Sequence, residues 1–187
     1  SLDGPDEETN DSIRQEDTFN RVVKNISLIR KKSSFELVLM FTVMRRNFRS
    51  LTSFFKLSQE LRTDGFIIER FIPWGRGRGR MDEVLSKEEW GELIGTLLNH
   101  FLIDEKNALL PYQAFQVNFN GEEPELLGAP CVIGRDGLCI MPEGIVFPCR
   151  RFPIPVGNLM SESLKEIWES SSLLDQLRNK KNLKGRC

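Results

Sequence analysis

Residues 131–149 read Cys131-Val-Ile-Gly-Arg-Asp-Gly-Leu-Cys139-Ile-Met-Pro-Glu-Gly144-Ile-Val-Phe-Pro-Cys149, and they hold three of the four cysteines in the chain. No cysteine precedes them. Two short apolar runs flank the Pro-Glu-Gly sequence, which is turn chemistry between strands. The stretch predicts a β-hairpin with a thiol at each end. Because thiolates are the ligands of iron–sulfur clusters, the pattern favours a metal or cluster site at Cys131, Cys139 and Cys149.

Composition and charge narrow the classes of protein. The chain has 187 residues, of which 40% are hydrophobic, and its formal net charge is −1. Such a chain can bury a core, and it has no general attraction to nucleic acid or to an anionic membrane. No apolar run approaches the roughly 18 residues of a transmembrane helix, so we expect a cytoplasmic protein without a membrane partner. In that reducing compartment, cysteines are expected as metal ligands or free thiols.

Residues 18–119 alternate between helical and strand-like patterns. Apolar residues at three-and-four spacing predict helices over 18–32, from Asn47 as a cap to Gly65, and from the capping box Ser86–Glu89 onward. Apolar runs predict a strand buried on both faces at 35–43 and further strands at 66–72 and 111–119. The alternation indicates parallel α/β structure. The βα units are too few to close a complete barrel, which predicts the second half of one.

The spacing of Cys131, Gly144 and Cys149 resembles the opening of the SPASM extension of radical S-adenosylmethionine (SAM) enzymes, where Cys-x(9–15)-Gly-x(4)-Cys begins an auxiliary [4Fe–4S] site. Three later segments resemble the same family: Pro153–Leu159, Ser163–Trp168 and Leu183–Cys187. The resemblance implies that Cys131, Cys139, Cys149 and Cys187 are auxiliary-cluster ligands in the intact protein. In the family the last of these opens a longer cysteine run, so we expect the chain to be cut there.

The N-terminal stretch resembles the segment after the fourth barrel strand in the same family. Ser1-Leu-Asp-Gly, Asn10-Asp-x-x-Arg14 and Thr18-Phe19 correspond to Ser-Leu-Asp-Gly, His-Asp-x-x-Arg-Gly and Gly-Thr-Phe, with Asn10 in place of the His and Gln15 in place of the Gly. By that resemblance Ser1 and Arg14 lie near the amino-acid end of SAM, where a guanidinium can donate two parallel hydrogen bonds to a carboxylate. Composition alone would instead make residues 3–17 a solvated acidic tail.

The resemblance also implies a domain organisation. Radical SAM domains are partial (βα)6 TIM-like barrels, so residues 1–120 are expected to be the C-terminal part of such a barrel. Residues 121–187 are expected to be the N-terminal part of the SPASM auxiliary domain, a small Cys-containing β-hairpin with a helix extension. The Cys-x(3)-Cys-x(2)-Cys motif that binds the SAM-cleaving cluster in the family is absent from the chain. We therefore expect a fragment cut at both ends, which cannot cleave SAM alone.

The loop Pro73-Trp-Gly-Arg-Gly-Arg-Gly-Arg80 is a second candidate site. Alternating Gly and Arg after an aromatic residue can bind phosphate or single-stranded nucleic acid. The patch is small and no wider basic face extends it, so nucleic acid is the less favoured partner. The family often carries Phe-x-Pro-x-Gly-Arg-Gly here. That resemblance implies a loop lining the SAM or substrate cavity, with Trp74 among the cofactor-binding residues and the backbone of 72–75 passing the adenine.

The residue after Cys149 separates subfamilies. In anaerobic sulfatase-maturating enzymes, to which the hairpin is similar, that residue is an aspartate that acts as a base. Here it is Arg150, followed by Arg151. A guanidinium stays protonated at neutral pH and cannot act as a base there, so sulfatase maturation is disfavoured. The basic pair suits an anionic substrate beside the cluster, either a carboxylate or an acidic peptide, or it tunes the cluster through its charge.

These patterns together favour a fragment of a radical SAM oxidoreductase or maturase. In the intact parent, SAM and its radical SAM [4Fe–4S] cluster would supply a 5′-deoxyadenosyl radical, and auxiliary [4Fe–4S] clusters would bind substrate or move electrons. The implied partners are a peptide, protein or small cofactor-precursor substrate and an electron donor such as a flavodoxin or ferredoxin. The alternatives are a metal-free remnant and a non-catalytic Cys-rich zinc-binding or interaction module. The cysteine gaps lack the usual Cys-x(2–4)-Cys zinc knuckles, which weighs against that module.

Overall fold

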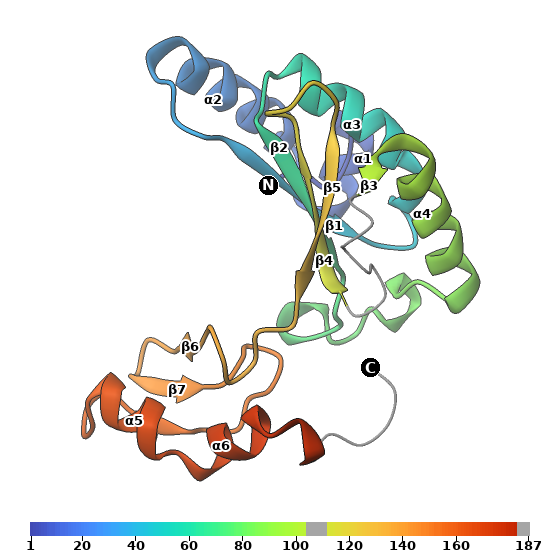
Figure 1. Cartoon of the computed structure of the whole chain (residues 1–187). Helices are drawn as coiled ribbons and strands as arrows, with labels where there is room; N and C mark the ends of the chain where they lie inside the picture. The colour runs from blue at the N-terminus through green and yellow to red at the C-terminus, as the bar shows by residue number, and fades with distance from the viewer. Residues whose placement is uncertain (104–111, 183–187) are drawn as a thin grey trace. The chain divides into compact units, whose positions relative to one another are not determined.

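The computed structural model describes residues 1–103 and 112–182. The chain divides into two compact units, Ser1–Pro130 and Cys131–Cys187 (Figure 1). The division lies after residue 130, because strand β5 (Glu125–Pro130) pairs with strand β4 (Tyr112–Asn118) in the sheet of the first unit. The assignment of residues 1–120 to a partial barrel and of residues 121–187 to a SPASM domain stays a prediction.

The first unit contains a five-stranded sheet in the order β1-β2-β4-β5-β3. Strands β1 (Val38–Val43) and β2 (Gly65–Arg70) are parallel, and β3 (Leu102–Ile103) is parallel to β5. Strand β4 is antiparallel to both of its neighbours, β2 and β5. The α/β class is thus confirmed, whereas the expected all-parallel arrangement is wrong. After the crossover from β2 to β3 the chain reverses direction, and the β4–β5 hairpin enters the sheet between those two strands.

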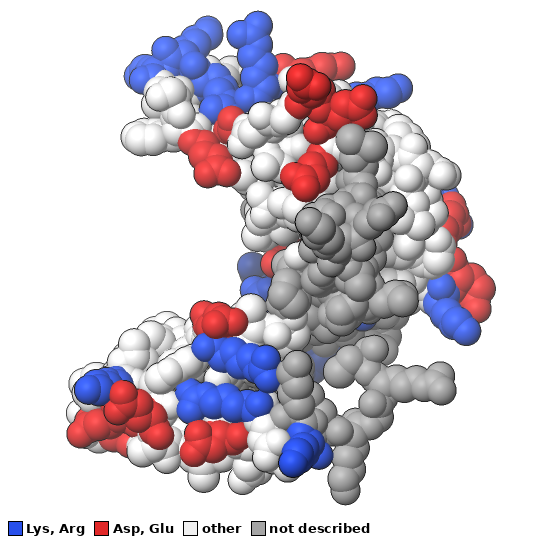
Figure 2. Space-filling view, viewed as in Figure 1, with Lys and Arg blue, Asp and Glu red and all other residues white. Residues whose placement is uncertain are grey.

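The helices follow the predicted periodicity closely. The first unit contains helices α1 (Glu7–Ile13), α2 (Thr18–Lys32), α3 (Leu51–Glu60) and α4 (Lys87–His100), and short 3-10 turns η1 (Phe48–Ser50), η2 (Gly75–Gly77) and η3 (Met81–Glu83). The expected capping box opens α4, where Ser86 N donates to Glu89 Oε2 at 2.7 Å and Glu89 N donates to Ser86 Oγ at 3.2 Å. Figure 2 shows basic side chains gathered over the end of α2, whose last turn is basic and so complements the helix dipole.

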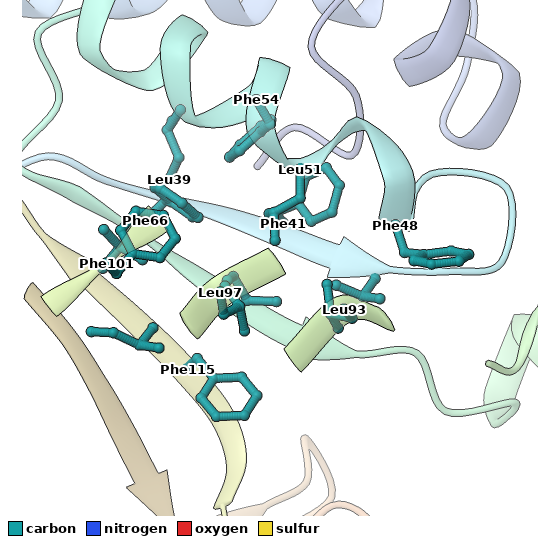
Figure 3. Close-up of a cluster of buried hydrophobic side chains, with 14 of the residues drawn as sticks. Leu39, Phe41, Phe48, Leu51, Phe54, Phe66, Leu93, Leu97, Phe101 and Phe115 are labelled. Atoms are coloured by element: carbon teal, nitrogen blue, oxygen red, sulfur yellow. The ribbon is translucent and has the colours of Figure 1, made fainter. Parts of the chain in front are cut away.

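The core of the first unit lies between the sheet and helices α3 and α4, which cover the same face (Figure 1). Phe54 of α3 packs against Phe41 and Phe66, with ring centroids 4.5 and 5.4 Å away, and the α4 residue Leu97 is fully buried beside them (Figure 3). Burial alternates along β1, where every second residue is only partly covered. The prediction that this strand is buried on both faces is therefore wrong.

The second unit is built around the predicted hairpin. Strands β6 (Cys139–Ile140) and β7 (Ile145–Phe147) are antiparallel, and β8 (Gly157–Asn158) adds to β7. Helices α5 (Leu164–Ser170) and α6 (Ser172–Arg178) follow, with a final turn η4 (Lys180–Asn182). Val146, Ile167 and Leu174 form its buried centre. Of the helices in the described ranges, none has the length and apolar character needed to cross a bilayer.

Candidate functional site

A cavity of about 600 Å³ lies where the parallel strands of the first unit end. Its lining includes Met44, the residue after β1, and Phe71, the residue after β2. Asp3 also lines it, from a segment that runs beside β1: Leu2 N donates to Met40 O at 3.1 Å. Ligands of open α/β sheets bind outside the carboxyl ends of the strands, and pockets of about 300–1,000 Å³ hold small molecules. The position and size of the cavity both suit a ligand site.

A buried network holds Asp3 at the wall of this cavity. Asp3 is only 3% exposed, and its Oδ1 accepts a hydrogen bond from Thr42 N at 2.9 Å. Its Oδ2 accepts from Arg14 Nε at 2.8 Å. The Asp3 backbone N–H donates to Asn10 Oδ1 at 2.9 Å, and Asn10 is fully buried. The alternative of a solvated acidic tail is therefore wrong, because this segment is fixed against β1.

Asn47 completes the network in a role that its sequence position did not predict. Expected as a helix cap, it makes no capping hydrogen bond with its side chain. Its Oδ1 instead accepts from Met44 N at 2.7 Å, and its Nδ2 donates to the carbonyl oxygens of Asp3 and Thr42, both at 2.9 Å. The side chain thus ties the N-terminal segment to the end of β1, where the cavity begins.

The structure brings one of the three predicted cofactor-binding residues to the cavity. Arg14 lines it, with a side chain that is 32% exposed and held through Nε by Asp3. Ser1 and Trp74 are not among the residues that line it. Trp74 is 53% exposed, and the guanidinium carbon of Arg78 lies 4.8 Å from its ring centroid. Cofactor binding by Ser1, Arg14 and Trp74 stays a prediction, with Arg14 placed best for it.

The glycine–arginine loop after β2 folds back toward the same cavity. Gly75 has a φ of 58°, which favours glycine and opens the turn η2. A Cβ on Gly77 would lie 3.0 Å from Phe71 Cζ, so glycine lets the loop approach the end of β2. Arg76 and Arg80 line the cavity, whereas Arg78 does not. The loop was predicted to line a cavity; the structure also shows which of its arginines do so.

The hairpin of the second unit carries one cysteine on a strand and another close to the end of the paired strand. Cys139 pairs with Phe147, and Cys149 lies two residues beyond Phe147. Burial alternates along this edge: Val146 and Pro148 are buried, whereas Phe147 and Cys149 are half-buried. Strand β7 ends at Phe147, however, and Cys149 lies beyond a bend at Pro148, where it forms an isolated bridge with Phe152. The hairpin therefore places Cys139 on β6 and Cys149 just past the end of the neighbouring strand β7.

The surroundings of Cys149 suit a thiolate. The backbone N–H of Arg151 donates to Cys149 Sγ at 3.4 Å, and hydrogen bonds to sulfur are among the features that tune iron–sulfur centres. Cys131 is exposed at the start of the unit, and Cys187 lies outside the described residues. Arg150 is exposed and Arg151 is half-buried, so a substrate role for this pair stays a prediction.

The donor set fits an iron–sulfur cluster in its chemistry, since it consists of thiols. Within residues 1–103 and 112–182, however, no three His, Cys, Asp or Glu side chains converge closely enough to hold a metal ion. Residues 1–130 contain no cysteine, so all thiols of the chain lie in the second unit. These thiols fit an auxiliary cluster in their chemistry, and cluster binding by them stays a prediction.

Another cavity, of about 730 Å³, lies within the second unit and was not predicted. Apolar side chains from the hairpin and from α5 line it, among them Ile140, Leu164 and Trp168. Ile140 and Leu164 are 50% and 45% exposed. This groove could not be predicted from the apolar spacing of α5, because the same spacing is typical of a helix face that is fully buried in a core.

The second unit matches a known protein family, and the whole chain is similar to several known proteins. The SPASM iron–sulfur cluster-binding domain matches residues 131–187. Along its whole length the chain is 30% identical to the AdoMet-dependent heme synthase of Methanosarcina barkeri and 26% identical to that of Nitratidesulfovibrio vulgaris, covering 57% and 55% of those proteins. Mycofactocin maturase MftC of Mycobacterium tuberculosis is 27% identical over 95% of the chain and 46% of its own length.

The chain thus spans about half the length of the curated relatives it matches, since it covers between 46% and 57% of their sequences. The SPASM match falls on the unit that carries the cysteine hairpin. The similarity to AdoMet-dependent relatives extends through the first unit, which carries the cavity at the ends of the strands. These matches confirm that the chain resembles radical SAM/SPASM proteins along its whole length.

Proposed function

We propose that this chain supplies part of the SAM site and the first auxiliary-cluster ligands of a radical SAM/SPASM oxidoreductase or maturase. The observation that carries the proposal is the cavity of about 600 Å³ at the carboxyl ends of the strands, with Arg14 in its wall. Relatives are named as a heme synthase and as a maturase, so a cofactor precursor and a peptide or protein are both substrate classes for the intact enzyme.

Arg14 is proposed to bind the carboxylate of SAM. Its Nε is fixed by Asp3, whose other oxygen is fixed by the backbone of Thr42. The guanidinium is therefore oriented before a ligand arrives, which reduces the entropy lost on binding. Across the described ranges Arg14 makes no other side-chain hydrogen bond, so its Nη nitrogens are available to a ligand. Trp74 and the backbone of 72–75 are proposed to approach the adenine, and Ser1 the amino-acid end.

The cysteine hairpin is proposed to hold an auxiliary [4Fe–4S] cluster through Cys131, Cys139 and Cys149, with Cys187 as a further ligand. Cys139 lies on β6 and Cys149 just beyond the end of its partner strand β7, and the Arg151 N–H would stabilise the charge on the Cys149 thiolate. Arg150 and Arg151 follow these ligands directly in sequence, and a role next to an anionic substrate is proposed for them. A flavodoxin or ferredoxin is the proposed electron donor.

In the complete enzyme, SAM and its own [4Fe–4S] cluster would supply the radical that abstracts hydrogen from the substrate. The residues of this chain contribute binding and orientation: Asp3 positions Arg14, and Arg14 receives the carboxylate. No cysteine precedes Cys131, so the ligands of the SAM-cleaving cluster are proposed to lie outside this chain. We propose that the chain binds SAM but does not cleave it.

Isothermal titration calorimetry of the chain with SAM tests this proposal. Arg14→Ala should weaken SAM binding by about ten- to a hundredfold, because it removes a charge-assisted hydrogen bond. Arg49→Ala is the matched control, since Arg49 is exposed, pairs with Glu92 at 2.9 Å and does not line the cavity. 5′-Methylthioadenosine, which lacks the carboxylate, should bind Arg14→Ala and the unmodified chain equally.

Two outcomes would contradict the proposal. One is an unmodified chain that does not bind SAM. The other is equal SAM affinity in Arg14→Ala and Arg49→Ala. Arg14→Lys tests whether a loss of SAM affinity in Arg14→Ala results from misfolding, because the lysine variant keeps a cation beside the buried carboxylate of Asp3. It should bind SAM with intermediate affinity, since an ammonium cannot form the two parallel hydrogen bonds of a guanidinium.

A further inference from the structure

The cavity of the first unit contains more positive charge than SAM requires. Four arginines line it, Arg14, Arg21, Arg76 and Arg80, against a single acidic residue, Asp3. Asp3 is already engaged by Arg14 at 2.8 Å. The nearest carboxylate oxygen to Arg21 belongs to Asp17, 4.0 Å away, and both side chains are about two-thirds exposed, so solvent screens this pair.

Arg76 and Arg80 have no ion pair or side-chain hydrogen bond in the part of the chain that the structure describes. Their direction is set by the backbone. Gly77 N donates to Trp74 O at 3.0 Å and Arg80 N donates to Gly77 O at 2.9 Å, which closes two successive turns. This backbone brings the first and third arginines of the loop to the cavity, while the second, Arg78, lies over the Trp74 ring.

SAM does not account for this charge. SAM contributes one carboxylate, for which Arg14 suffices, and it also carries an ammonium and a positively charged sulfonium. Three more guanidinium groups in the same cavity would repel these cations unless another anion were bound. Guanidinium groups without a protein partner are suited to oxyanions, with which they form paired, charge-assisted hydrogen bonds.

We propose that the cavity also binds a small organic substrate that carries at least two oxyanion groups, carboxylate or phosphate, through Arg76 and Arg80, with Arg21 as a third contact. As a substrate site, this inference rests on the proposed function. The volume of about 600 Å³ allows a small molecule to bind there. Of the substrate classes open to the enzyme, a cofactor precursor with several acidic groups fits this cavity better than a neutral peptide.

Binding of simple polyanions to the chain tests the inference, with citrate, pyrophosphate and acetate as probes at constant ionic strength. Citrate or pyrophosphate should bind more tightly than acetate, and the tighter of the two identifies the oxyanion. The double variant Arg76→Ala/Arg80→Ala should lose about ten- to a hundredfold in affinity for it. Arg78→Ala, which removes one guanidinium from the same loop, should bind it as the unmodified chain does, whereas Arg76→Ala and Arg80→Ala should each weaken binding when made singly.

Any of four results would overturn the inference. The first is that Arg78→Ala and the double variant weaken polyanion binding equally, and the second is that the double variant binds the polyanion with unchanged affinity. The third is that acetate binds as tightly as the polyanions. The fourth is that a single-stranded oligonucleotide binds more tightly than the polyanions and that its binding depends on Arg78, because stacking beside Trp74 would then carry the binding. Circular dichroism checks that the variants fold; both arginines are exposed, so no loss is expected.

The SAM titration separates this inference from the proposed function. If SAM binds and polyanions do not, the inference fails and the proposed function stands. If polyanions bind through Arg76 and Arg80 and SAM does not bind, the proposed function fails and the anion site stands.

Discussion

Nη2 of Arg30 lies 2.5 Å from the Oδ2 atom of Asp64, and this ion pair joins the end of α2 to the start of β2. The same oxygen accepts the backbone N–H of Leu37 at 2.6 Å, just before β1. The backbone of Asp64 adds two bonds, accepting from Phe119 N at 3.0 Å and donating to Leu37 O at 2.9 Å. One aspartate thus ties together three segments at the end of the sheet opposite the cavity.

The first prediction concerns the pH dependence of this contact. The Leu37 N–H and then the Arg30 guanidinium hold the pKa of Asp64 below its ordinary value. A carboxyl whose pKa is lower in the folded state stabilises the fold above its unfolded pKa, about 4, and that stability is lost as the pH falls through the folded value. Asp64→Asn should therefore cost about 1.5–3 kcal/mol near neutral pH, and the deficit should shrink below about pH 4.

Urea unfolding of the unmodified chain and of Asp64→Asn across this pH range measures the difference. Asp82→Asn is the control, since Asp82 is an exposed carboxylate in the turn η3 and makes no ion pair or side-chain hydrogen bond within the described residues. A deficit in Asp64→Asn that stays constant between neutral and acidic pH would mean that the ion pair does not contribute through its charge.

The second prediction concerns Gly65, the first residue of β2. A Cβ at this position would lie 2.1 Å from the carbonyl oxygen of Val117 on β4, so the two strands approach too closely for any side chain. Gly65→Ala should destabilise the first unit by about 1–3 kcal/mol, because the backbone of one strand must move. Gly91→Ala in α4 is the opposite case, with nothing within 4 Å of its Cβ, and should stabilise by about 0.5–1 kcal/mol. Thermal unfolding of both variants checks the sign, and equal effects would refute the steric argument.

The third prediction gives a physical reason for the glycine between the motif cysteines. Gly144 has a φ of 81°, and a Cβ there would lie 2.9 Å from Asn158 Oδ1 and 3.1 Å from Met160 Cγ. Gly144→Ala should cost at least about 1–2 kcal/mol, the penalty of a left-handed residue with a side chain. It should also lower the iron bound after anaerobic reconstitution. Gly137→Ala, which lies in the same unit and meets only Val132 Cγ2 at 3.5 Å, should change neither.

Local sequence patterns predicted where most helices and strands lie. The direction of the strands and the partners of buried polar side chains depend on long-range contacts, and these could not be predicted. The hairpin between Cys139 and Cys149 was predictable because its turn residues and apolar runs are adjacent in the chain. The direction of β4 was not, because an apolar run at 111–119 looks the same in a parallel and in an antiparallel strand. Asn47 has a residue type and position typical of a helix cap, so its sequence predicted capping. Its actual partners could not be predicted, because Asp3 is 44 residues away in the chain and the carbonyl of Thr42 is positioned by β1.

The arginines of the loop show the same limit at the candidate site. From sequence, Arg76, Arg78 and Arg80 are equivalent members of one Gly–Arg repeat. The positive φ of Gly75 and the two turns that follow decide which of them line the cavity. Such side-chain directions depend on backbone torsions that the residue types allow but do not specify.

The last prediction concerns the cysteines as cluster ligands. Cys131→Ala and Cys149→Ala should each lower the iron and acid-labile sulfide retained after anaerobic reconstitution, because a cluster loses one of the thiolates that hold it. Cys139→Ala should have a smaller effect, since a half-buried thiol on a strand can also be a packing residue. Val132→Ala is the matched control, as Val132 is 44% exposed and adjacent to Cys131.

Counting zinc in the same samples separates the cluster from a zinc module. A cluster requires iron and sulfide together, whereas a structural zinc site would hold zinc without sulfide and would lose it in the same variants. A site that uses both Cys139 and Cys149 as ligands should lose metal in either variant. Unchanged iron in both Cys131→Ala and Cys149→Ala would remove the hairpin from the cluster site and leave Gly144 and the Arg151–Cys149 hydrogen bond as features of folding alone.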